Sequence, residues 1–160
     1  MLFSSIPFLY YFLPPVLLLY LAAPKKLKNA VLLAASLFFY GWGERHLVLL
    51  FALSVLMGWA IGLAMEKTEK KSLRRALLLC AVFYDLGLLV YSKYTDFIIE
   101  IVSGITGLGI SLPGIALPIG ISFYTFQLLS YDIDVYRRTV PAQKDPIAFG
   151  AYVAMFPQLI

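Results

Sequence analysis

Polar and ionisable side chains interrupt an otherwise apolar stretch, LPIGISFYTFQLLSYDIDVYRR, at residues 117–138. They include Gln127, Tyr131, Asp132 and Asp134. Their amide, hydroxyl and carboxyl groups can bind a polar substrate or exchange protons. In a helix that turns about 100° per residue, a subset of this stretch falls within a sector about 80° wide. That subset is Gly120, Tyr124, Gln127, Tyr131, Asp134 and Arg138, so the spacing predicts one polar stripe.

Two interpretations of this stripe stay open. Polar groups inside a membrane are costly, so they face protein or water. The stripe can therefore line a substrate channel, with candidate lining residues Gly120, Tyr124, Gln127, Tyr131 and Asp134. Alternatively, Asp132 and Asp134 pair with Arg137 or Arg138 at the membrane surface, where long side chains reach water.

Asp85 is a second candidate, because FYDLGLLVYSKY puts this carboxyl in the middle of another apolar window. An ionisable group at such a position suggests function by default. It could relay protons in a transporter, or it could be a buried carboxyl that is hydrogen-bonded to a neighbouring helix. We favour the second interpretation, because no second acid is expected within the membrane beside it.

The elements that must hold these residues are predicted from composition. The 160 residues are 61% hydrophobic, and the mean hydropathy is +0.85. A membrane-spanning helix needs about 20 apolar residues. The expected windows are 3–23, 29–42, 46–65, 76–92, 117–136 and a last one that begins near Ile147. We therefore expect an all-α, polytopic transmembrane helical bundle that forms a single domain over residues 1–160, with about five complete spans and a truncated sixth.

The first window is expected to be an uncleaved span rather than a signal peptide. No Lys or Arg precedes Lys25, and no small-residue cleavage pattern follows the apolar run. Pro14 and Pro15 should kink or divide the helix, because proline lacks a backbone donor.

The net charge of +4 is explained by position along the chain rather than by nucleic acid. Three loops hold nearly all basic residues: Lys25, Lys26 and Lys28; Lys67, Lys70, Lys71, Arg74 and Arg75; Arg137, Arg138 and Lys144. Only Arg45 and Lys93 fall on the other side. The positive-inside rule makes the basic side cytoplasmic, so the N-terminus is expected outside.

The residue pattern predicts no phosphate-binding, disulfide or metal site. Residues 94–118 begin with amphipathic spacing and become rich in Gly and Pro, but they match no phosphate-binding motif. We expect an interfacial or re-entrant segment there. Cys80 is the one cysteine, so no disulfide or cysteine metal site can form, and we expect no metal and no bound cofactor.

Three passages carry a family resemblance. Residues 117–138 closely resemble a hallmark of the bacterial membrane-bound O-acyltransferase family, in the branch of alginate O-acetyltransferases and the D-alanyl transfer protein of teichoic acid modification. LLAASLFFYGWGE, residues 32–44, and DLGLLVYSKYTDF, residues 85–97, are similar to the family's second and fourth spans. MFPQLI, residues 155–160, looks like the opening of a further family segment, so the chain is expected to be the N-terminal portion of a longer domain.

The resemblance implies an enzyme of the bacterial plasma (inner) membrane. Its donor would be a cytoplasmic acyl thioester, acetyl-CoA or acyl carrier protein. Its acceptor would be an exported polysaccharide or an extracytoplasmic carrier. The family's catalytic histidine has no counterpart here, and His46, the one histidine, is interpreted as an interfacial residue. No catalytic residue is therefore assigned, and the chain alone is expected to be inactive, with the remaining half of the bundle as its partner.

Two departures and two alternatives remain. Asp132 stands where the family is expected to have an uncharged residue. Asp85 stands where the family is expected to have an Asn. A transporter or channel component would also line a path with such a stripe. A non-catalytic membrane scaffold would tolerate substitutions of the Gln127 face.

Overall fold

The computed structural model describes residues 6–43, 47–107 and 120–155, and this part of the chain is helical without strands. The helices are α1, Leu13–Ala22; α2, Lys28–Gly43; α3, Leu47–Lys67; α4, Lys71–Thr106; α5, Ile121–Arg137; and α6, Pro146–Ala154. Each apolar window predicted from the sequence overlaps one of them. The all-α helical class is confirmed. By length and composition, one helix among the described residues, α3, is long and apolar enough to cross a membrane.

The first window is divided, as its two prolines predict. A π-helical turn, Pro7–Phe12, precedes α1, and the Leu13 backbone N–H donates to the Phe8 carbonyl oxygen. Pro14 and Pro15 then lie in the first turn of α1. The first turn of a helix has no intrahelical acceptors for its N–H groups, so the missing proline donors cost little there.

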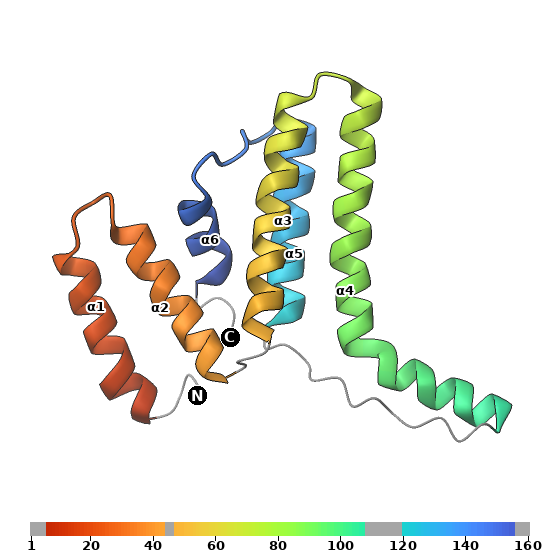
Figure 1. The fold of residues 1–160 in the computed structure, drawn as a ribbon, viewed down its shortest axis with the longest axis horizontal. Helices are drawn as coiled ribbons and strands as arrows, with labels where there is room; N and C mark the ends of the chain where they lie inside the picture. The colour runs from red at the N-terminus through yellow and green to blue at the C-terminus, as the bar shows by residue number, and fades with distance from the viewer. Residues whose placement is uncertain (1–5, 44–46, 108–119, 156–160) are drawn as a thin grey trace.

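α4 extends beyond its predicted window and bends in its lower half (Figure 1). The Thr95 hydroxyl donates to the Tyr91 carbonyl, a contact that loosens the helical ladder and favours a bend. The helix ends where Gly107 takes a left-handed conformation with φ of 69°. The predicted re-entrant part of the segment, residues 108–119, lies outside the described residues.

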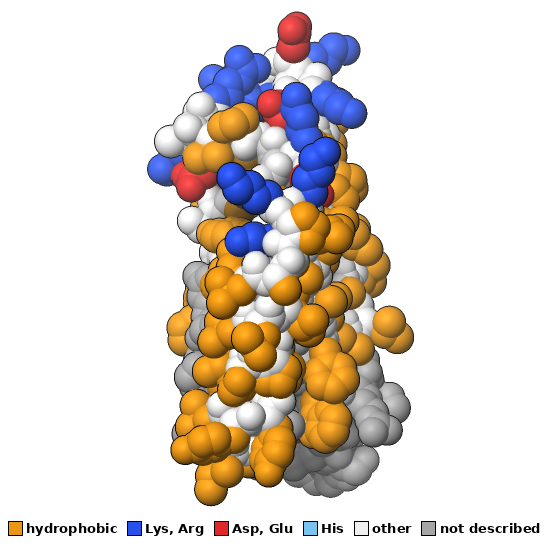
Figure 2. All heavy atoms as spheres, turned by 90° about the vertical axis from the view of Figure 1, so that its left-hand side faces the viewer, with side chains coloured by type: hydrophobic (Ala, Val, Ile, Leu, Met, Phe, Trp, Pro, Cys, Tyr) orange, Lys and Arg blue, Asp and Glu red, His pale blue; other side chains and the backbone are white. Residues whose placement is uncertain are grey.

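Charged side chains gather at one end of the molecule. The connections α1–α2, α3–α4 and α5–α6 all lie at that end in Figure 1. Figure 2 shows Lys, Arg, Asp and Glu concentrated there above a mainly hydrophobic body. The three basic loops predicted to share one side therefore do lie together.

α5 packs against α3, α4 and α6. Its buried face follows helical spacing: Ile121, Tyr124, Thr125, Leu128, Leu129, Asp132 and Val135. Two glycines of α3, Gly58 and Gly62, let α5 approach closely. A Cβ atom on Gly58 would lie 2.9 Å from a Leu128 methyl carbon, and one on Gly62 would lie 2.7 Å from the Tyr131 hydroxyl oxygen. Small residues four apart are a common means of close helix packing in membranes.

Replacement of Gly62 by Ala is expected to lower the free energy of unfolding by about 1–3 kcal/mol, because the new methyl group meets the Tyr131 ring. The matched control is Gly87→Ala in α4, where an added Cβ meets nothing within 4 Å. Alanine should stabilise that helix by about 0.5–1 kcal/mol. Circular dichroism during unfolding by sodium dodecyl sulfate in mixed micelles measures both, and equal effects would contradict the packing.

Candidate functional site

The residues of the predicted stripe on α5 lie in two environments. Tyr124 and Gln127 contact neighbouring helices, whereas Tyr131 and Asp134 line a hollow. Gly120 stands just before the helix in a left-handed conformation with φ of 71°. Tyr124 is 1% exposed and its ring meets the Phe51 ring edge-on, at 4.9 Å between centroids. Gln127 donates from Nε2 to the Tyr152 carbonyl oxygen of α6, at 3.2 Å. Tyr131 and Asp134 lie nearer the charged end and line a hollow.

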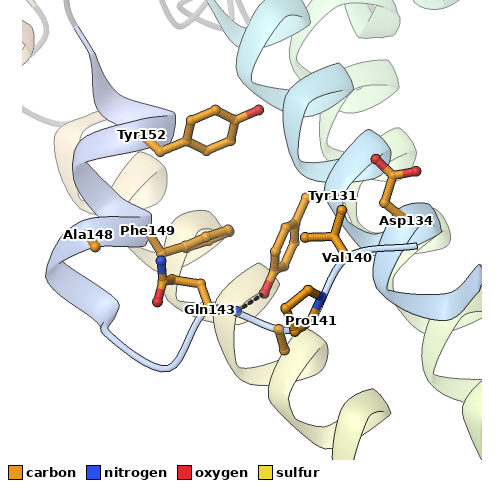
Figure 3. A pocket seen from close by; sticks show the side chains of 9 residues that line it. Tyr131, Asp134, Val140, Pro141, Gln143, Ala148, Phe149 and Tyr152 are labelled. Carbon is orange, nitrogen blue, oxygen red and sulfur yellow. Dashed lines mark hydrogen bonds between the residues drawn. The ribbon is translucent and has the colours of Figure 1, made fainter. Parts of the chain in front are cut away.

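This hollow has a volume of about 410 Å³ and lies between α5, α6 and the connection that joins them. Figure 3 shows the Tyr131 and Tyr152 rings extending into the space between the two helices. The remaining lining residues are Val140, Pro141, Ala142, Gln143, Ala148 and Phe149. The hollow combines aromatic rings with a few polar groups, as small-molecule sites commonly do.

The α5–α6 connection is held in place by side chains of two helices, α3 and α5. The Gln143 N–H donates to the Tyr131 hydroxyl oxygen at 3.0 Å, and the Trp59 indole N–H donates to the Gln143 carbonyl oxygen at 2.9 Å. The Ala142 N–H donates to a Glu66 carboxylate oxygen at 3.1 Å. Asp145 then caps α6 by accepting from the Ile147 N–H. One wall of the hollow is therefore a fixed loop.

Arg74 joins the start of α4 to the end of α5. Its Nη2 donates to the carbonyl oxygens of Val135 and Tyr136, and its guanidinium lies 5.4 Å from the centre of the Tyr136 ring. A cation at the C-terminus of a helix satisfies carbonyls that have no intrahelical donor. A second hollow of about 440 Å³ lies beside it, lined mainly by charged residues that include Glu66, Lys67 and Arg138.

The structure corrects one interpretation of Asp85. We expected no second acid to accompany it, but Asp132 is 0% exposed on α5, a helix that packs against α4. Asp85 itself is 4% exposed. The alternative that paired Asp132 with Arg137 or Arg138 fits neither this burial nor its two carboxylate oxygens, which have no hydrogen-bond partner.

Helical periodicity alone missed Asp132 because it falls outside the sector that holds Tyr124, Gln127 and Tyr131. α5 is covered by α3, α4 and α6, so it buries more than one sector of its surface. One sequence signal could have indicated that Asp132 is buried: it falls on the same face of the helix as Leu128 and Thr125. His46 lies outside the described residues, and the described residues contain no cluster of three potential metal ligands.

Comparison with known proteins shows which class of proteins the chain resembles. The chain matches O-acetyltransferases over its full length, which confirms the predicted resemblance to this branch of the membrane-bound O-acyltransferases. The chain corresponds to part of such a protein, because it spans about a third of the length of the curated relatives it matches.

The particular relatives include the probable alginate O-acetylase AlgI of Pseudomonas putida, 43% identical over 100% of this chain and 34% of that protein. The protein of the same name from Pseudomonas aeruginosa is also 43% identical, over 100% of this chain and 32% of its own length. A peptidoglycan O-acetyltransferase of Helicobacter pylori is 28% identical over 98% of this chain and 31% of that protein. No family model and no solved structure matches the chain.

Replacement of Tyr131 by Phe is expected to free the α5–α6 connection while the ring stays in place. The Gln143 N–H loses its acceptor, which should cost about 0.5–1.5 kcal/mol and speed hydrogen exchange at that amide. Tyr152→Phe is the control, since its hydroxyl belongs to an exposed side chain of the same hollow. Hydrogen-exchange mass spectrometry of residues 139–145 makes the measurement, and unchanged exchange in Tyr131→Phe would contradict this role.

Proposed function

We propose that the chain is the N-terminal part of a membrane-bound O-acyltransferase. The intact protein would transfer an acyl group, expected to be acetyl, from a cytoplasmic thioester donor to a hydroxyl of an exported polysaccharide or carrier. The observation that carries this proposal is the similarity of nearly the whole of this chain to about a third of the length of alginate O-acetylases and of a peptidoglycan O-acetyltransferase. The donor would be acetyl-CoA or an acyl carrier protein.

In this proposal the helices cross the bacterial inner membrane several times, with the N-terminus outside. The support is the gathering of basic residues at one end of the molecule, which the positive-inside rule assigns to the cytoplasm. The hollow lined by Tyr131 and Asp134 lies near that end, on the side from which a cytoplasmic donor would come.

The stripe on α5 would line part of the donor's path. Acyl transfer needs a base to activate the acceptor hydroxyl, and it needs a cavity that holds thioester and acceptor in reacting geometry. No residue of this chain is assigned as the base. Gly120, Tyr124, Gln127, Tyr131 and Asp134 would instead shape the cavity, and further helices of the longer protein would complete it.

Gln127→Ala combined with Tyr131→Ala should reduce acyl transfer by the longer protein by about 10- to 100-fold, because misplacement of a bound substrate costs rate steeply. Phe126→Ala is the matched control, since that ring is 60% exposed on the same helix. The assay counts O-acetyl groups on exported polysaccharide, normalised to protein in the membrane. Unchanged acetylation in the double variant would remove the stripe from the donor's path.

The 160 residues alone should not transfer acyl groups, because the histidine that the family resemblance implies has no counterpart among them. Cells whose own locus is deleted would receive either this chain or the longer reading frame, and the O-acetyl content of the exported polysaccharide would be compared. Acetylation by the chain alone would contradict the proposed division of labour. Failure of the longer form to acetylate would contradict the proposed function itself.

A further inference from the structure

The lower segment of α4, residues 93–106, extends away from the other helices beyond the bend (Figure 1). Burial on α4 ends where this segment begins, because the buried residues of the helix are Ala81, Asp85, Leu89 and Ser92. Five large apolar side chains of the lower segment are between 41% and 80% exposed: Phe97, Ile98, Ile101, Val102 and Ile105. A contiguous apolar face of this kind marks an interaction site, so it calls for an apolar partner.

The lower segment is amphipathic. At about 100° per residue, its five exposed apolar side chains and Tyr94 fall within a sector about 140° wide. The opposite sector holds its ionisable and hydroxyl side chains, together with Ile99: Lys93, Thr95, Asp96, Glu100, Ser103 and Thr106. A helix with this division of faces is suited to the boundary between the headgroups and the acyl chains of a bilayer.

The length of α4 before the bend places the lower segment at such a boundary. In the proposed membrane arrangement, α4 starts at the basic α3–α4 connection and crosses the bilayer. Residues 76–92 are about 26 Å long at about 1.5 Å per residue, and the hydrocarbon core of a bilayer is about 30 Å thick. The bend near Thr95 therefore comes where the helix leaves the hydrocarbon, on the side opposite the basic connections.

The direction of the bend turns the apolar face toward the hydrocarbon. α3 and α5 pack against the upper half of α4, residues 71–92, and α4 bends away from these two helices (Figure 1). On the helical projection, the apolar sector of the lower segment continues the outer face of the upper half, which carries the exposed side chains Leu79, Phe83, Leu86 and Val90. A bend away from the buried face puts this outer face on the inside of the bend, where it faces the layer that the upper half crosses.

Aromatic and basic side chains at the bend fit the same boundary. Tyr91 and Tyr94 are exposed, and the Lys93 ammonium nitrogen lies 5.8 Å from the centre of the Tyr94 ring. Tyrosine is enriched where a membrane meets water, and a lysine beside it can extend its charge to the headgroups. The bend therefore carries residue types that hold a helix at a membrane surface.

We propose that the lower segment of α4 binds the phospholipid leaflet opposite the basic connections. Its five exposed apolar side chains lie among the acyl chains, and Lys93 and Glu100 lie among headgroups and water. The inference rests on the proposed membrane arrangement, but it is independent of acyl transfer, because it needs neither donor nor acceptor.

The test is electron paramagnetic resonance of nitroxide labels on single cysteines of the longer protein in phospholipid nanodiscs, in a cysteine-free background that includes Cys80→Ser. Oxygen concentrates in hydrocarbon, whereas nickel ethylenediaminediacetate stays in water, so the ratio of the two accessibilities measures depth. Ile101→Cys and Ile105→Cys should show a ratio that favours oxygen, at a depth of about 5–10 Å. Lys93→Cys and Glu100→Cys are the matched controls on the polar face, and their ratio should favour the nickel complex. All four side chains are exposed, so the labels disturb no packing.

The results at Ile101 and Ile105 decide the proposal. Access of the nickel complex equal to that at Glu100 would put the apolar face in water. Low accessibility to both reagents would mean that protein covers the face. Either result would overturn the proposal.

Phe83→Cys separates this proposal from the membrane arrangement on which it rests. That side chain is 75% exposed on the upper half of α4, so oxygen should reach its label in the hydrocarbon. Oxygen access at Phe83 without oxygen access at Ile101 would overturn the binding of the lower segment alone. Access of the nickel complex to Phe83 would overturn the membrane arrangement, and this inference with it.

Discussion

The separation of charged from apolar residues is the constraint on which the arrangement of this chain depends. Hydrocarbon offers no partner to a charge, so a chain that is 61% hydrophobic must carry its basic residues beyond the apolar body or bury its polar groups among helices. The three basic connections lie at one end of the molecule, beyond the apolar body (Figures 1 and 2). Asp85 on α4 and Asp132 on α5 are buried among the helices instead.

α5 carries residues of both kinds, because it has polar side chains near the charged end and a carboxyl in the interior. Near the charged end, its Tyr131 forms a wall of the hollow and holds the α5–α6 connection through Gln143. On another sector, the same helix buries Asp132. Gly62 permits the position of Tyr131, because the absence of a side chain at that point of α3 leaves room for the Tyr131 ring. One helix therefore contributes both to the candidate site and to the buried acidic residues.

The sequence predicted the helices well because their signals are local. Apolar runs of helical length, two prolines at the start and loops with basic residues are each visible without tertiary information. The extent of α4 was underestimated, since Lys93 and Asp96 interrupt the apolar run without breaking the helix before Gly107. The stripe on α5 was also a local signal, and it located Tyr131 and Asp134 at the hollow.

The burial of Asp132 could not be predicted in this way. Periodicity groups residues of one helix, but it does not say which sectors neighbouring helices will cover. Asp132 therefore seemed free to reach Arg137 or Arg138, and Asp85 seemed to have no acidic neighbour. Only the packing of α5 against α3, α4 and α6 shows that Asp132 is buried. The close fit of Gly62 to Tyr131 depends on tertiary structure for the same reason.

The sidedness of the charged end tests the proposed membrane arrangement most directly. In a Cys80→Ser background, single cysteines would replace Lys26, Lys70 and Arg138 in the three basic connections, and Glu100 near the opposite end of α4. A membrane-impermeant thiol reagent would be applied to intact spheroplasts and to inside-out vesicles. We predict labelling of the three connections only in inside-out vesicles and of position 100 only in spheroplasts. Labelling of any of the three connections in intact spheroplasts would contradict the arrangement.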